Sequence, residues 1–127
     1  MYYEKYTRIC GSGGNNIEME RIYNKLVRDK ITNIIKEKGE TPVARILDEI
    51  EYKNELEKKL YEEYKEVIEA TGDDRVEELA DMLEVIRALA NLESKNLNEV
   101  IAIADKKNEK RGAFEEKIFL EKVIEKE

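Results

Sequence analysis

The segment EEYKEVIEATGDDRVEELAD, residues 62–81, decides the fold that this chain is expected to adopt. It contains two pairs of carboxylates on either side of Gly72, and each pair has the i, i+3 spacing that places both members on one helix face. The four carboxylates are Glu63, Glu66, Glu78 and Asp81. Residues equidistant from a turn at Gly72 would lie at the same height in two antiparallel helices. The sequence therefore predicts a helical hairpin that gathers four acidic side chains.

Two of these carboxylates conflict with the apolar pattern of their helices. Glu63 falls within the stripe formed by Leu56, Leu60 and Val67, and Glu78 falls within the broad apolar side of the next helix. Most other acidic residues of this segment are expected to face solvent, which is the usual place for Glu. A salt bridge to Lys59 or Arg87 is a second explanation for a buried carboxylate.

Electrostatics favours a cation over a bare acidic cluster. Two carboxylates about 5 Å apart repel by roughly 3 kcal/mol at an effective dielectric constant near 20. Without a metal some of the four would stay protonated. Carboxylate ligands without His or Cys are typical of Mg²⁺, with Mn²⁺ as an alternative. The pattern predicts a magnesium site for phosphate chemistry.

Composition limits the classes of protein and of site. The chain has 127 residues, a net charge of −7, no histidine and one cysteine, Cys10. The negative charge disfavours a nucleic-acid polymer as a partner, and the lack of His excludes most zinc sites and histidine bases. A single cysteine cannot form an internal disulfide and fits a cytoplasmic setting. No apolar run is long enough to predict a membrane span.

The remaining pattern predicts an all-α protein, an antiparallel bundle of about four helices. Helices are expected within residues 24–38, with irregular first turns and Gly39 as the C-terminal cap, and at about 50–70, 74–91 and 96–112. The expected N-caps are Asp48, Asp74 and Asn96, and Asn96 is expected to form a capping box with Glu99. Residues 113–127 are expected to form a short strand or an extended tail. Residues 1–18 are interpreted as a flexible natural extension or an added segment, because a Gly/Ser/Asn-rich stretch lies at 11–16. The helical domain is expected to span 19–127.

Three motifs in order resemble a known family. The pattern E-E-x-x-E at 62–66, followed by E-x-x-D at 78–81, resembles the signature of the MazG-like all-α nucleotide pyrophosphohydrolases. The segments YNKLVRDKI at 23–31 and KNEKRGAF at 107–114 look like the phosphoribosyl-ATP pyrophosphohydrolase-like branch. Thr32 departs from that branch, which often has proline at this position.

The resemblance implies a Mg²⁺-dependent enzyme that cleaves the α–β bond of a nucleoside triphosphate to a monophosphate and pyrophosphate, and that assembles as a dimer or tetramer. Carried over, the metal ligands are Glu63, Glu66, Glu78 and Asp81. Glu63 is chosen as the catalytic base. Cations proposed for the substrate phosphates are Lys25, Arg28, Lys30, Lys107, Lys110 and Arg111, and aromatic residues considered for a base-binding wall are Tyr23, Tyr61, Tyr64 and Phe114. Two alternatives stay open, hydrolysis of phosphoribosyl-ATP in histidine synthesis and a non-catalytic helical interaction module.

Overall fold

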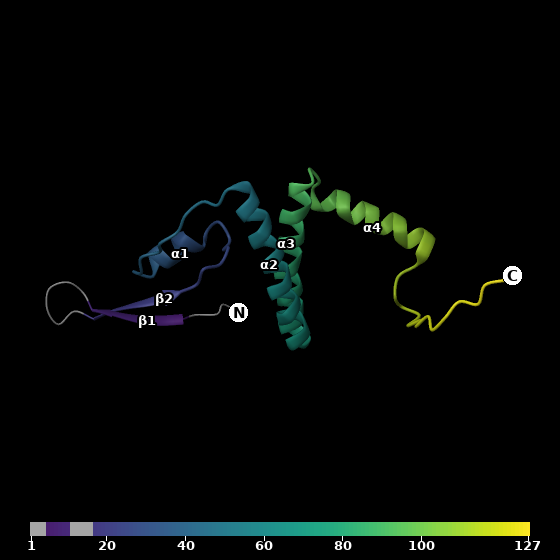
Figure 1. The fold of residues 1–127 in the computed structure, drawn as a ribbon, viewed down its shortest axis with the longest axis horizontal. Coiled ribbons are helices and arrows are strands. Elements are labelled where there is room, and N and C mark those ends of the chain that lie inside the picture. The colour runs from purple at the N-terminus through teal and green to yellow at the C-terminus, as the bar shows by residue number, and fades with distance from the viewer. Residues whose placement is uncertain (1–4, 11–16) are drawn as a thin grey trace. The chain divides into compact units, whose positions relative to one another are not determined.

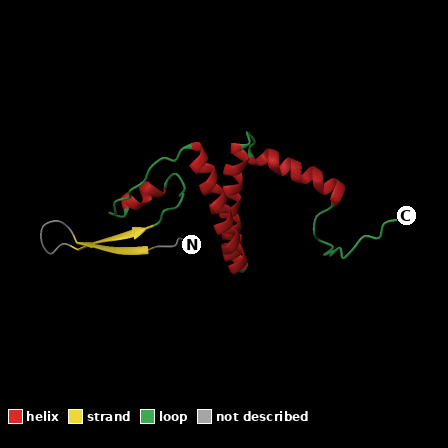
Figure 2. Cartoon of the chain, in the orientation of Figure 1, coloured by secondary structure: helices red, strands yellow, loops and turns green. Residues whose placement is uncertain are grey.

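The computed structural model of this chain describes residues 5–10 and 17–127, with side chains from Met19 onward. The chain divides into two compact units, Met1–Leu89 and Ala90–Glu127. Four α-helices dominate the described residues, which confirms the expected all-α class (Figures 1 and 2). None of the described helices combines the length and the apolar character that crossing a lipid bilayer requires.

A short β-hairpin opens the first unit. Strand β1 (Lys5–Cys10) pairs antiparallel with β2 (Ile17–Ile22), and Lys5 lies opposite Ile22. This hairpin was not predicted, although Tyr, Thr and Ile in β1 favour strands. Strand β2 crosses the domain boundary placed after residue 18. Residues 1–4 and 11–16, which were also expected to be flexible, lie outside the described residues.

Helix α1 (Ile31–Glu37) is preceded by an irregular segment, as expected for residues 24–30. It ends in a Schellman motif, because the Gly39 N–H donates to the Lys36 carbonyl at 3.0 Å and the Glu40 N–H donates to the Ile35 carbonyl at 3.2 Å. Gly39 has φ of 82°, a left-handed conformation that favours glycine. The C-terminal cap predicted at Gly39 is therefore confirmed.

Helix α2 (Glu49–Glu69) begins at the predicted cap. The Asp48 carboxylate accepts the Glu51 backbone N–H at 2.8 Å. Beyond Ala70 and Thr71 the chain enters helix α3 (Gly72–Leu92). The N-cap predicted at Asp74 is wrong, because α3 begins two residues earlier and Asp74 lies in its first turn, where acidic charge favours the helix N-terminus.

The turn between α2 and α3 is held by Arg75. Its Nε–H lies 3.2 Å from the Val67 carbonyl and 3.0 Å from the Ala70 carbonyl, so it satisfies groups at the end of α2 that lack helical partners. The two helices run antiparallel and side by side, as the predicted hairpin requires (Figure 1). Among the side chains that the structure describes, the buried residues are Leu56 and Val85, with 3% and 6% exposure, and Glu63.

The second unit contains helix α4 (Leu97–Arg111). Asn96 and Glu99 form the predicted capping box, with N–H to oxygen distances of 2.8 and 3.4 Å. The helix ends at Gly112, also as predicted. Residues 112–127 include a turn that brings the Lys117 N–H to the Phe114 carbonyl and contain no strand, so the extended-tail alternative describes them.

Candidate metal centre

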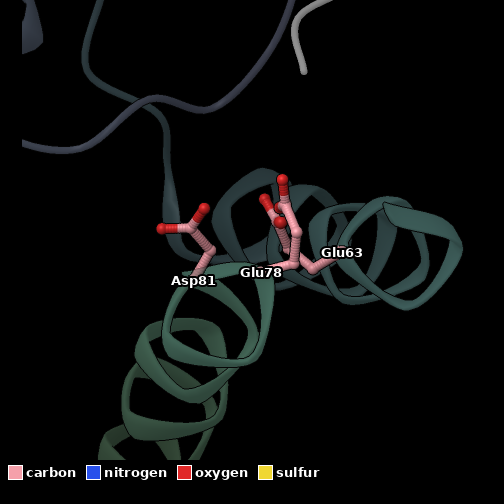
Figure 3. Close-up of side chains that lie close together, drawn as sticks. All are labelled: Glu63, Glu78 and Asp81. Atoms are coloured by element: carbon pink, nitrogen blue, oxygen red, sulfur yellow. The ribbon is translucent and has the colours of Figure 1, made fainter. Parts of the chain in front are cut away.

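Three of the four predicted carboxylates meet between α2 and α3. Glu63 extends from α2, and Glu78 and Asp81 extend from α3. One carboxylate oxygen from each lies within 4.8 Å of the others (Figure 3). The arrangement follows from the sequence because Glu63 and Asp81 are equidistant from the turn, and Glu78 is one helical turn before Asp81.

Burial distinguishes this group from ordinary surface acids. Glu63 is 9% exposed, which makes it the one buried charged residue among the described side chains. Glu63 Oε2 and Glu78 Oε2 are both buried, and neither has a hydrogen-bond partner in the part of the chain that the structure describes. A buried oxygen without a partner destabilises a fold, so the two atoms indicate a ligand that is not part of the polypeptide.

The surroundings of Glu63 favour its neutral form. Burial raises the pKa of the Glu63 carboxyl above its ordinary value, because loss of water disfavours the charged form. The nearby Lys59 acts in the opposite direction, while the negative charges of Asp81 and Glu78 raise this pKa further. A bound cation would favour the charged form of Glu63, because its positive charge would offset the negative charges of all three carboxylates.

No protein-family model, curated protein or solved structure matches this chain. The chemistry assigned to the site therefore rests on its own residues. Oxygen ligands are what Mg²⁺ and Mn²⁺ prefer, and Mg²⁺ usually keeps several waters beside one or two carboxylates. The three carboxylates and their two unpartnered oxygens fit such an ion.

The fourth predicted ligand, Glu66, lies outside the group of three. It follows Glu63 by one turn of α2 and is half-buried. Its assignment as a metal ligand stays a prediction, because its oxygens are not among those within 4.8 Å of one another.

Cations from two parts of the chain approach the acidic group. Arg28 Nη2 donates to Asp81 Oδ1 at 2.8 Å. Lys25 Nζ lies 3.5 Å from Glu62, and Lys59 Nζ lies 4.0 Å from Glu63 Oε1. Of the predicted phosphate-binding cations, Arg28 thus contacts one of the three carboxylates, and Lys25 contacts Glu62, the residue before Glu63.

The salt-bridge explanation for a buried carboxylate holds in part. Lys59 does lie beside Glu63, at i−4 on the same helix, but Glu63 Oε2 stays without a hydrogen bond. Arg87 instead pairs with Glu84. Lys59 was not among the predicted site residues, although its helical spacing from Glu63 is the signal that identifies it as a neighbour.

The other predicted substrate residues are exposed. Lys30 is exposed at the N-cap of α1. Lys107, Lys110 and Arg111 lie on α4 in the second unit and are exposed, so their role as phosphate ligands stays a prediction.

Two of the aromatic residues considered for a base-binding wall, Tyr61 and Tyr64, do not share the helix face of Glu63, and Tyr23 is half-buried in the segment before α1. Tyr61 and Tyr64 stack on each other on α2, with ring centroids 6.2 Å apart and Lys65 above the Tyr61 ring. Their Cα positions lie about 160° and 100° round the helix from Glu63. Phe114 is 98% exposed in the second unit.

Proposed function

We propose that this chain is a Mg²⁺-dependent nucleotide pyrophosphohydrolase. It would cleave the α–β bond of a nucleoside triphosphate or related nucleotide and release a monophosphate and pyrophosphate. The observation that carries the proposal is the group formed by Glu63, Glu78 and Asp81, in which two buried carboxylate oxygens have no hydrogen-bond partner among the described residues. The resemblance of residues 62–81 to the MazG-like signature supports the same reaction.

Acidic and basic residues would have different roles in this reaction. The three carboxylates would hold the metal, with Mn²⁺ as a substitute for Mg²⁺. When bound, the ion would polarise the phosphoryl group and offset the charge of the leaving pyrophosphate. Arg28 pairs with Asp81, and Lys25 pairs with Glu62, the residue before Glu63. Both cations would bind phosphate oxygens, and the planar guanidinium of Arg28 suits two of them at once.

Glu63 is the proposed base. Its Oε2 has no hydrogen-bond partner among the described residues, and the carboxylate would take a proton from the attacking water. The water oxygen would bond to one of the two phosphorus atoms that the α–β bridging oxygen joins. The bond between that phosphorus and the bridging oxygen would break, and its electron pair would leave with the bridging oxygen on the other product.

Self-association is part of the proposal. Helix α3 exposes an apolar groove lined by Leu79, Ala80, Met82, Leu83 and Ile86. The two leucines are 47% and 42% exposed, and Tyr61, Tyr64 and Ile68 are exposed on α2. A patch of this kind marks a contact surface. A second copy of the hairpin would cover it and complete a four-helix arrangement.

A non-catalytic interaction module is the competing function. The same exposed apolar residues favour it, because they would bind a partner equally well whether or not the chain is an enzyme. The buried carboxylates distinguish the two functions, since an interaction module has no need for unpartnered Oε2 atoms on Glu63 and Glu78.

Product analysis tests the enzyme proposal. The protein would be incubated with Mg²⁺ and a panel of ribo- and deoxynucleoside triphosphates, together with phosphoribosyl-ATP, and pyrophosphate would be resolved from orthophosphate. We expect pyrophosphate release that is lost in Glu63→Gln and Glu78→Gln but kept in Glu77→Gln, which removes an exposed charge from the same helix. Release from phosphoribosyl-ATP alone would assign the histidine-synthesis reaction. A folded protein that releases no pyrophosphate from any substrate would overturn the proposal.

A further inference from the structure

Arg28 connects the irregular segment before α1 to the acidic group on α3. Its Nη2 donates to Asp81 Oδ1 at 2.8 Å, across 53 positions of sequence. Asp81 is also one of the three carboxylates whose oxygens lie within 4.8 Å of one another. The guanidinium therefore already supplies one positive charge to a carboxylate of the proposed metal site.

The guanidinium and a divalent ion compete for the same carboxylate. A lone pair of Asp81 Oδ1 that accepts the Arg28 N–H is not available to a metal, and two positive charges this close repel each other. The pair is also easily separated. The side chains of Arg28 and Asp81 are 52% and 48% exposed, and ion pairs with this much solvent access are weak.

Once separated from Asp81, Arg28 is suited to another anion. A guanidinium presents a rigid fork of N–H donors that matches two phosphate oxygens. The segment that carries Arg28 is further held beside α2 by Lys25, which lies 3.5 Å from Glu62. The freed side chain would thus stay next to the acidic group instead of moving away with a flexible loop.

We propose that Arg28 is an internal counter-cation, which the divalent metal displaces from Asp81 and which then binds the substrate phosphate. Metal binding and phosphate binding are coupled through this one side chain, so each promotes the other. The inference rests on the proposed metal site and adds to it a role for Arg28 before substrate arrives.

Calorimetric titration separates the two halves of this role. Mn²⁺ alone would be titrated into the wild-type chain and into Arg28→Met, which keeps the length of the side chain and removes its charge. We expect the variant to bind Mn²⁺ about two- to fivefold more tightly, the range that corresponds to losing a solvent-exposed competing pair. Inorganic pyrophosphate, titrated with Mn²⁺ in excess, should bind the variant about tenfold or more weakly, because a charge-assisted phosphate contact is lost. Arg28→Lys should fall between the two.

Arg45→Met is the matched control. Arg45 makes a bidentate pair with Glu51 at 2.7 and 3.2 Å, so the variant removes the same charge without altering the acidic group. Mn²⁺ affinity that is unchanged or reduced in Arg28→Met would overturn the displacement, and pyrophosphate affinity that is unchanged would overturn the transfer to phosphate. Either result leaves the metal site intact, whereas the absence of Mn²⁺ binding in all chains would overturn the proposed function itself.

Discussion

At the scale of single residues, Glu63 occupies a position at which the apolar pattern of α2 predicts a hydrophobic side chain. It lies between Leu60 and Val67 on the packing face of α2 and is 9% exposed. Lys59 compensates one oxygen, while the second has no partner and faces the charges of Glu78 and Asp81. In the absence of metal this residue costs the protein stability, because a buried charge lacks a compensating partner.

Glu63→Gln should stabilise the metal-free protein at pH 7, by about 1 kcal/mol, because it removes a buried charge and its repulsion. Since the pKa of Glu63 is raised in the folded state, folding takes up a proton between the unfolded value of about 4.3 and the raised value. Stability therefore falls as pH rises through that window. Urea denaturation should show a higher free energy of unfolding for Glu63→Gln than for the wild-type chain at pH 7, and no such difference near pH 4. An equal gain at both pH values, or a loss at pH 7, would contradict this explanation.

These carboxylates could be predicted from the sequence because their conflict with the apolar pattern is local to each helix. Glu63 and Glu78 stand out from the helical period alone, and the equal distances of Glu63 and Asp81 from Gly72 place the acidic pair of α3 beside Glu63. The partner of Asp81 was not predictable in this way. Arg28 reaches it from an irregular segment, whose path depends on tertiary packing and not on any periodicity.

At the scale of elements, helix ends were predicted wherever a side chain or a glycine completes the hydrogen bonding locally. Asp48 and Asn96 accept N–H groups three residues on, and Gly39 adopts the left-handed conformation of a Schellman motif. Asp74 was predicted wrongly as a cap, since the Arg75 N–H already donates to the Thr71 carbonyl and starts the helix earlier. The β-hairpin was overlooked because its Gly/Ser/Asn-rich connection was interpreted as a linker.

Ser94→Gly should stabilise the chain by roughly 0.5–1 kcal/mol. Ser94 has φ of 59° at the end of α3, where the Lys95 N–H donates to the Ala90 carbonyl at 3.0 Å, a position that favours glycine. Thermal or urea denaturation would measure the gain. Ser94→Ala is the control, because it keeps the Cβ atom and should bring no gain. If alanine stabilised the chain as much as glycine, backbone strain would not be the cause.

At the scale of the whole molecule, many apolar side chains lie outside the described core and are exposed. Leu56 and Val85 are the buried hydrophobic residues among the described side chains, while Leu79, Leu83 and Val76 on α3 remain substantially exposed. A chain of 127 residues normally buries a larger core than this. The proposed self-association would supply the missing burial.

Leu83→Glu should weaken that self-association at least tenfold, since the charge would replace an apolar contact in each copy of the interface. Sedimentation velocity over a range of concentrations would show the wild-type chain as a dimer or tetramer and the variant as a lighter species. Val43→Glu introduces the same charge at a connector residue that is 98% exposed and should leave assembly unchanged. A wild-type chain that sediments as a monomer at high concentration would rule out the proposed assembly.

The most direct test of the metal site is thermal unfolding with and without Mg²⁺. At a Mg²⁺ concentration tenfold above its Kd, binding to the folded state should add about 1.4 kcal/mol of stability and raise the Tm by several degrees. Glu78→Gln should lose this shift, because it removes one of the three clustered carboxylates, whereas Glu77→Gln on the same helix should keep it. A wild-type chain whose Tm ignores Mg²⁺, or an equal shift in Glu78→Gln, would contradict the assignment of the acidic group as a metal centre.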